Sequence, residues 1–128
     1  MIKGLDQLKA RADFVRLTAT RCRAAGPGLV LQSAPQPEGL RGSASPIRVG
    51  FTASRKIGNA VTRNRAKRKL REAARAVLPL RGKPGTDYVL IAREGTAARP
   101  FAALVADLEA SLRRIEAGAR RRTAAQDD

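Results

Sequence analysis

The chain has 128 residues, enough for one domain with a hydrophobic core, and its 26 Lys and Arg against 11 Asp and Glu give a net charge of +15. This charge favours a polyanionic partner, either nucleic acid or an anionic membrane surface. The lack of histidine excludes histidine-based nucleophiles and histidine metal sites, and the single cysteine, Cys22, excludes an internal disulfide. No apolar run approaches the ~20 residues of a membrane span, and residues 1–14 lack the apolar region of a secretory signal, so we expect a cytoplasmic protein without membrane or disulfide-linked partners.

The N-terminal region predicts one short helix followed by a connector. An amphipathic helix within residues 5–18 is indicated by four apolar residues at helical spacing, Leu5, Leu8, Ala12 and Val15. Phe14 and Leu17 form a second apolar pair beside that stripe. Residues 19–28 are basic and broken by Gly-Pro-Gly, so we expect a connector there.

Two strands are predicted next, at residues 29–34 and 47–54, joined by a mobile surface loop at 35–46 that is rich in Pro, Gly and Ser. The second strand alternates between apolar and small or polar residues, so its two faces have different environments. One face belongs to the core. The other face, which carries Thr52 and Ser54, is either simply exposed or forms the floor of a groove.

Residues 55–75 are the most informative stretch of the chain. They contain one acid, Glu72, and nine basic residues: Arg55, Lys56, Arg63, Arg65, Lys67, Arg68, Lys69, Arg71 and Arg75. A helix capped by Asn59 or Thr62 is predicted by one apolar stripe, Ala66, Leu70, Ala73, Ala74, Val77 and Leu78. Because like charges four residues apart repel one another, this helix is best suited to a polyanionic partner.

The C-terminal part predicts a turn-rich linker at residues 79–86, a strand at 88–92 covered on both faces, and a helix from Pro100 to about residue 116. Tyr88 and Phe101 are assigned to packing. Residues 119–128 show no apolar pattern, so we expect a domain at 1–118 and a disordered tail. The order helix, strand, strand, helix, strand, helix implies an α+β fold.

Three segments of the chain form a recognisable set. The longest is RVGFTASRKIGNAVTRNRAKRKLREA at residues 48–73, flanked by LKARADFVRL at 8–17 and DYVLIARE at 87–94. In their order along the chain, the three segments resemble the bacterial ribonuclease P protein subunit. The resemblance covers most of residues 5–116. It implies a two-layer α/β sandwich like the second domain of ribosomal protein S5, with about four strands in a mixed sheet, three helices and a left-handed βαβ crossover. General topology rules would predict the opposite hand.

The resemblance also implies a function. The family's holoenzyme is an endoribonuclease that removes the 5′ leader from precursor tRNA, and its catalytic RNA carries the chemistry with Mg²⁺ bound mainly by that RNA. The protein would bind the RNA and the leader, and would be inactive alone. The family's RNA-binding positions fall on Arg55, Lys56, Arg63, Asn64, Arg65, Lys67 and Arg68, and the adjacent Lys69 and Arg71 extend this basic set.

The leader would lie in a cleft between the first helix and the sheet, formed by Phe14, Thr52, Ser54 and Gln32. Phe14 has two open interpretations, packing in the core or stacking on a leader base. Thr18 and Gln32 stand where some family members have further aromatics, so fewer stacking contacts are expected here.

A different class of function has to be weighed against this one. The eleven acids are scattered along the sequence, which does not favour a two-metal nuclease site on the protein. Composition alone fits a non-catalytic RNA-binding ribosomal or RNA-assembly protein equally well. Dependence of precursor tRNA cleavage on the protein would distinguish the two. A membrane-surface role is disfavoured because the stripe of the basic helix is rich in alanine and too weak to insert.

Overall fold

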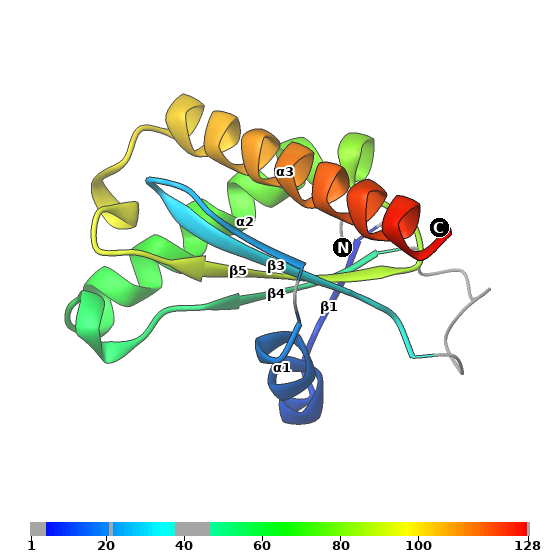
Figure 1. The fold of residues 1–128 in the computed structure, drawn as a ribbon. Coiled ribbons are helices and arrows are strands. Elements are labelled where there is room, and N and C mark those ends of the chain that lie inside the picture. Colours follow the sequence, from blue (N-terminus) through cyan, green and yellow to red (C-terminus); the bar gives the residue numbers. More distant parts are fainter. Residues whose placement is uncertain (1–4, 21, 38–46, 128) are drawn as a thin grey trace.

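The computed structural model of the protein describes residues 5–20, 22–37 and 47–127, with side chains up to Gly118. Its described strands form one mixed sheet in the order β1-β4-β5-β3-β2 (Figure 1). The strands are β1 (Leu5–Gln7), β2 (Cys22–Ala25), β3 (Leu29–Pro35), β4 (Ile47–Thr52) and β5 (Thr86–Ala92). The helices are α1 (Arg11–Thr18), α2 (Ala60–Arg81) and α3 (Phe101–Asp127), with short 3₁₀ turns at Arg55–Ile57 and Thr96–Ala98.

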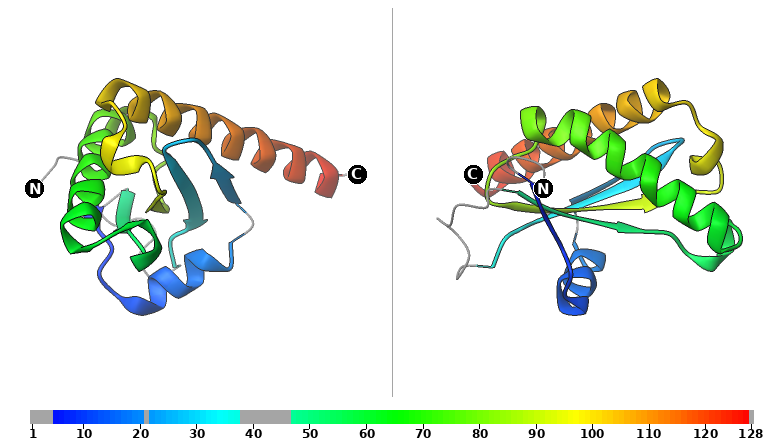
Figure 2. Two further views of the ribbon diagram at one scale, coloured as in Figure 1. Left: turned by 90° about the vertical axis from the view of Figure 1, so that its left-hand side faces the viewer. Right: turned by 180° about the vertical axis from the view of Figure 1, so that it is seen from behind.

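Helices cover both faces of the sheet, as the two views in Figure 2 show: α2 and α3 lie on one face and α1 lies alone on the other. The central strand β5 pairs parallel with β4 and antiparallel with β3. Helix α2 connects the parallel neighbours β4 and β5, as expected of a βαβ crossover unit. The predicted α+β class is therefore confirmed, with five strands in the described sheet where about four were expected.

The sequence pattern located three strands, and the two that it missed, β1 and β2, lie in the N-terminal region. The short helix expected within residues 5–18 is confirmed at Arg11–Thr18, with Asp13 in its first turn. Leu5 and Leu8 do not belong to it, and Leu5–Gln7 is a strand that pairs parallel with β4. Leu5 belongs to the hydrophobic cluster on one face of the sheet, and Leu8 belongs to the cluster on the other face. Their three-residue spacing therefore does not come from a helix. Val15 is 59% exposed, and the buried side of α1 is formed by Leu17 and partly by Phe14.

The predicted connector at residues 19–28 also contains a strand. β2 pairs antiparallel with β3, and the backbone N–H of Gly26 donates to the Leu29 carbonyl at 2.8 Å. The Gly-Pro-Gly break is therefore the turn of a hairpin. The strand at 29–34 is confirmed as β3, whereas the second predicted strand ends at Thr52 instead of residue 54. Residues 38–46 of the predicted loop lie outside the described part of the chain.

Helix α2 follows the prediction closely. The Oδ1 atom of Asn59 accepts a hydrogen bond from the Thr62 N–H at 2.9 Å, which identifies Asn59 as the cap. All six residues of the predicted apolar stripe are buried. The helix runs to Arg81, through Pro79 and into the predicted linker, because Val77 and Leu78 anchor its last turns in the core.

The C-terminal strand and helix are also confirmed. β5 is buried along almost its whole length, as expected for a strand covered on both faces. Burial raises the pKa of the Tyr88 hydroxyl, which accepts a hydrogen bond from the Lys83 N–H. Phe101 was assigned to packing but is 47% exposed. Helix α3 continues beyond residue 116 to Asp127, where no regular structure was expected, because alanine and arginine favour a helix without an apolar stripe.

Candidate nucleic-acid interface

The exposed side of α2 carries a dense group of positive charges, which we call the basic face: Arg63, Arg65, Lys67 and Arg68, with Asn64 between the first two. Arg65 and Arg68 are exposed, and Arg63 and Lys67 are half-buried. Within the described part of the chain, no carboxylate forms an ion pair with any of the four. Their charges are therefore available to an external anion.

Two further basic residues of α2 have partners inside the protein. The Nζ atom of Lys69 donates to the Arg99 carbonyl at 2.6 Å, which ties α2 to the loop before α3. The guanidinium of Arg71 lies 5.8 Å from the centre of the Phe51 ring. The sequence analysis grouped Lys69 and Arg71 with the RNA-binding residues. Each of the two also has a contact within the protein.

Arg55 and Lys56 lie in the exposed 3₁₀ turn between β4 and α2. Gly58 follows them with a φ of 142°, which a residue with a side chain rarely adopts. This turn places both cations just before the N-terminus of α2, where unpaired backbone N–H groups also attract anions.

The other predicted site residues lie on the side of the sheet that faces α1, which we call the α1 side. Phe14 lies directly over Gly50 of β4: a Cβ atom at Gly50 would lie 2.6 Å from the Phe14 ring. The Phe14 ring is half-buried and packs with Leu17 and Val89. Phe14 therefore packs in a small core as one interpretation expected, and its exposed portion leaves stacking on a leader base as a prediction.

Thr52, Gln32 and Ser54 differ in their exposure. Thr52 is half-buried, two residues along β4 from Gly50 and therefore on the same side of the sheet. Gln32 lies on this side because it pairs with Val89 across the two strands, but the residue is only 3% exposed. Ser54 is exposed beyond the end of β4. The structure thus brings Phe14, Thr52 and Gln32 to one side and leaves Gln32 little access to a ligand.

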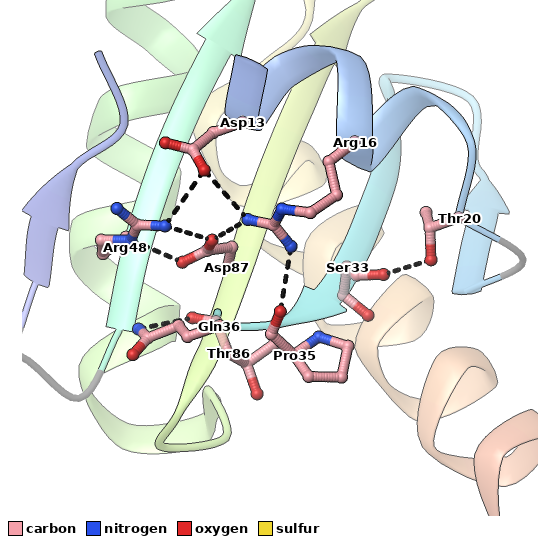
Figure 3. Close-up of polar contacts among 9 residues, drawn as sticks. All are labelled: Asp13, Arg16, Thr20, Ser33, Pro35, Gln36, Arg48, Thr86 and Asp87. Carbon is pink, nitrogen blue, oxygen red and sulfur yellow. Dashed lines mark hydrogen bonds and ion pairs between the residues drawn. The ribbon is translucent and has the colours of Figure 1, made fainter. Parts of the chain in front are cut away.

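An ion-pair network that the sequence analysis missed fixes α1 to the sheet (Figure 3). The carboxylate of Asp87 on β5 is fully buried and receives two hydrogen bonds from Arg48 on β4, at 2.8 and 2.6 Å. Arg16 of α1 also donates to Asp87, and it binds the Pro35 carbonyl at 2.9 Å. Asp13 joins the network by contacts of 3.2 Å to Arg16 and 3.4 Å to Arg48.

The network raises the pKa of one of its arginines and attaches α1 to the sheet. The hydrogen bond to Asp87 raises the pKa of Arg48. Because α1 has only eight residues and one fully buried side chain, Leu17, these contacts supply much of its attachment. They thereby position Phe14. The only sequence signals were an arginine in an alternating strand and an acid at the start of an apolar run.

The chain is similar to known proteins along most of its length. The family model for ribonuclease P matches residues 2–116. The chain belongs to the ribonuclease P protein family. Ribonuclease P protein components from Paramagnetospirillum magneticum and Ruegeria pomeroyi are 50% identical over 117 residues and 52% identical over 115. The alignments cover 91% and 89% of this chain, and 87% and 89% of the respective relatives.

Solved structures of this ribonuclease P family agree with the fold. The Thermotoga maritima ribonuclease P protein superposes with a TM-score of 0.68 at 25% identity, covering 85% of this chain and 96% of that one. The Staphylococcus aureus ribonuclease P protein gives 0.66 at 26% identity, covering 84% and 92%. In the described residues we find no helix with the length and hydrophobicity to cross a membrane. The same residues contain no group of three or more Cys, Asp or Glu able to hold a metal ion.

The close contact at Gly50 gives a test of how this ribonuclease P protein positions α1. Gly50→Ala would push the added methyl group into Phe14, and we expect a loss of about 1–3 kcal/mol in the free energy of unfolding, as for other overpacked sites. Urea denaturation measures this loss. In a Phe14→Leu background the same substitution should cost less, because the smaller side chain leaves room. An equal cost in both backgrounds would contradict the contact.

Proposed function

We propose that this member of the ribonuclease P family acts as the RNA-binding subunit of a ribonucleoprotein endonuclease that removes the 5′ leader of precursor tRNA. The observation that carries the proposal is the basic face of α2, whose four cations have no ion-pair partner among the described residues. Such a face binds phosphates and releases counterions, which makes binding strongly dependent on salt. A catalytic RNA is the proposed partner.

The α1 side of the sheet is proposed to hold the precursor tRNA leader. It has the half-buried Phe14 ring for stacking on a base and the half-buried Thr52 for a polar contact. The exposed Ser54 and the turn with Arg55 and Lys56 follow directly along the chain and lead to α2. A leader bound on this side would therefore continue toward the RNA on the basic face.

The chemistry is proposed to reside in the RNA subunit. Four acids with described side chains, Asp13, Asp87, Asp107 and Glu109, are already paired with arginines. Such paired carboxylates are poorly suited to collecting Mg²⁺ ions on the protein. We therefore propose that the RNA binds the Mg²⁺ that polarises the phosphodiester, and that the protein alone is inactive. We also propose that the complex works in the cytoplasm.

Leader recognition can be tested by binding. We expect the complex of bacterial ribonuclease P RNA with this protein to bind precursor tRNA with a leader more tightly than mature tRNA, and the RNA alone to show no such preference. Because one base stack contributes about 1–3 kcal/mol, Phe14→Leu should reduce the preference between about fivefold and a hundredfold. Equal affinity of the wild-type complex for both tRNAs would contradict leader binding. It would favour a non-catalytic RNA-binding protein, which composition alone fits but the family match does not favour.

A further inference from the structure

A cavity of about 250 Å³ lies between β1, β4 and α2, away from the α1 side. Strand β4 separates the two regions: Val49 and Phe51 face the cavity, whereas Gly50 meets Phe14 on the opposite face. From α2 the cavity receives Arg71, Ala74 and Arg75, and from the N-terminal segment Leu5 and Lys9, among others. It is therefore continuous with the helix that carries the basic face.

The lining combines an apolar floor with a positively charged rim. Lys9, Arg71 and Arg75 are exposed, and within the described part of the chain none of them forms an ion pair. One acid, Asp6, also lines the cavity, and its Oδ1 atom accepts the Gln7 N–H at 3.0 Å. The rim thus has three positive charges and one negative charge, which favours an anionic ligand.

Two planar groups lie together in this cavity. The Phe51 ring is half-buried, and the Arg71 guanidinium lies 5.8 Å from its centre. Unpaired RNA bases stack on aromatic rings and on guanidinium planes, while their phosphates bind nearby cations. The volume is slightly below the ~300–1,000 Å³ of sites that enclose drug-sized ligands, so it suits a single base better than a longer segment.

We propose that this cavity binds one unpaired nucleotide of the catalytic RNA, with the base against Phe51 and Arg71 and its phosphates at Arg75 and Lys9. The inference rests on the proposed function, because it assigns a second contact to the same RNA. The leader is a poor candidate for the occupant, since β4 lies between the cavity and the α1 side. RNA bound to α2 meets Arg71 and Arg75 by following the helix, because Arg71 lies four residues after Lys67 and Arg75 lies four residues after Arg71.

The test compares Phe51→Leu with Phe101→Leu, the same change at the exposed Phe101 on α3. Binding to bacterial ribonuclease P RNA should weaken between about fivefold and a hundredfold for Phe51→Leu, with an unchanged salt dependence, and should stay unchanged for the control. Phe51→Tyr retains the ring and should retain affinity. Because Phe51 also packs against the core, thermal unfolding of the free Phe51→Leu variant separates lost stacking from a damaged fold. Arg75→Ala should lower the slope of log affinity against log salt by about one unit relative to the exposed Arg113→Ala.

Chemical probing of the RNA gives an independent measurement. One unpaired nucleotide should be protected from a base-modifying reagent by the wild-type protein and by Phe51→Tyr, and become reactive with Phe51→Leu. The inference is overturned if Phe51→Leu binds as Phe101→Leu does, even if Arg75→Ala weakens binding, since only a phosphate contact would remain. If the wild-type protein fails to bind the RNA at all, the proposed function itself fails.

Discussion

Replacing Arg63 and Arg65 together with alanine is expected to remove most of the affinity for the catalytic RNA and leave the fold intact. Two charge-assisted contacts worth about 1.5 kcal/mol each correspond to roughly a hundredfold loss. The slope of log affinity against log salt should fall by about two units. The melting temperature should not decrease, because neither side chain has an ion-pair partner among the described residues, and because removing Arg63 relieves repulsion from Lys67 four residues away.

The matched control is Arg113→Ala, which removes an exposed arginine from α3 instead of α2. It should leave RNA affinity close to that of the wild-type protein. Filter binding over a range of salt concentrations, together with thermal unfolding of the free proteins, measures both quantities. A collapse of the melting temperature in the double variant would refute the separation between the basic face and the buried stripe of α2.

Asp87→Asn is expected to have the largest effect on stability of any single polar substitution in the domain. The Asp87 carboxylate is fully buried and accepts hydrogen bonds from Arg48 and Arg16, whose side chains are only 17% and 32% exposed. Losing this negative charge leaves two poorly solvated arginines with Asp13, at 3.2 and 3.4 Å, as their remaining acidic partner in the network. Breaking a buried pair by removing one partner typically costs about 3–5 kcal/mol. Because Arg16 lies on α1, the attachment of that helix should weaken most.

Glu109→Gln is the control, because it breaks the pair of Arg81 with Glu109, which is more exposed than the pairs of Asp87. Surface pairs contribute less than about 1 kcal/mol. Urea denaturation of both variants gives the two free energies. Hydrogen exchange should also show α1 opening in Asp87→Asn while α2 stays protected. If both variants lose the same small amount, the network of Arg48, Arg16 and Asp87 does not hold α1 in place.

The sequence predicted elements whose periodicity lasts over several turns. All six positions of the α2 stripe were assigned correctly, because a helix of 22 residues repeats its buried face many times. β1 and β2 have three and four residues, so their pattern is too short to separate from a helix or a connector. Both depend on pairing with strands that follow later in the sequence, β4 and β3.

The candidate site shows the same limit. The basic face was evident from composition and spacing on a single helix. The network around Asp87 joins residues 71 and 39 positions apart in the sequence, and no local pattern reports such a contact. Likewise, the burial of Gln32 and the contact of Lys69 with the Arg99 carbonyl follow from how distant elements pack. Family resemblance supplied the expected roles, and packing determined which side chains remain accessible.

Reconstitution of cleavage tests the central claim most directly. A precursor tRNA with a 5′ leader is incubated at low Mg²⁺ with bacterial ribonuclease P RNA, with this protein, or with both, and the 5′ ends of the products are mapped. We predict correct 5′ maturation only when RNA and protein are both present. Cleavage by the protein alone would contradict an RNA-borne active site, and tight RNA binding that never restores cleavage would contradict the subunit role.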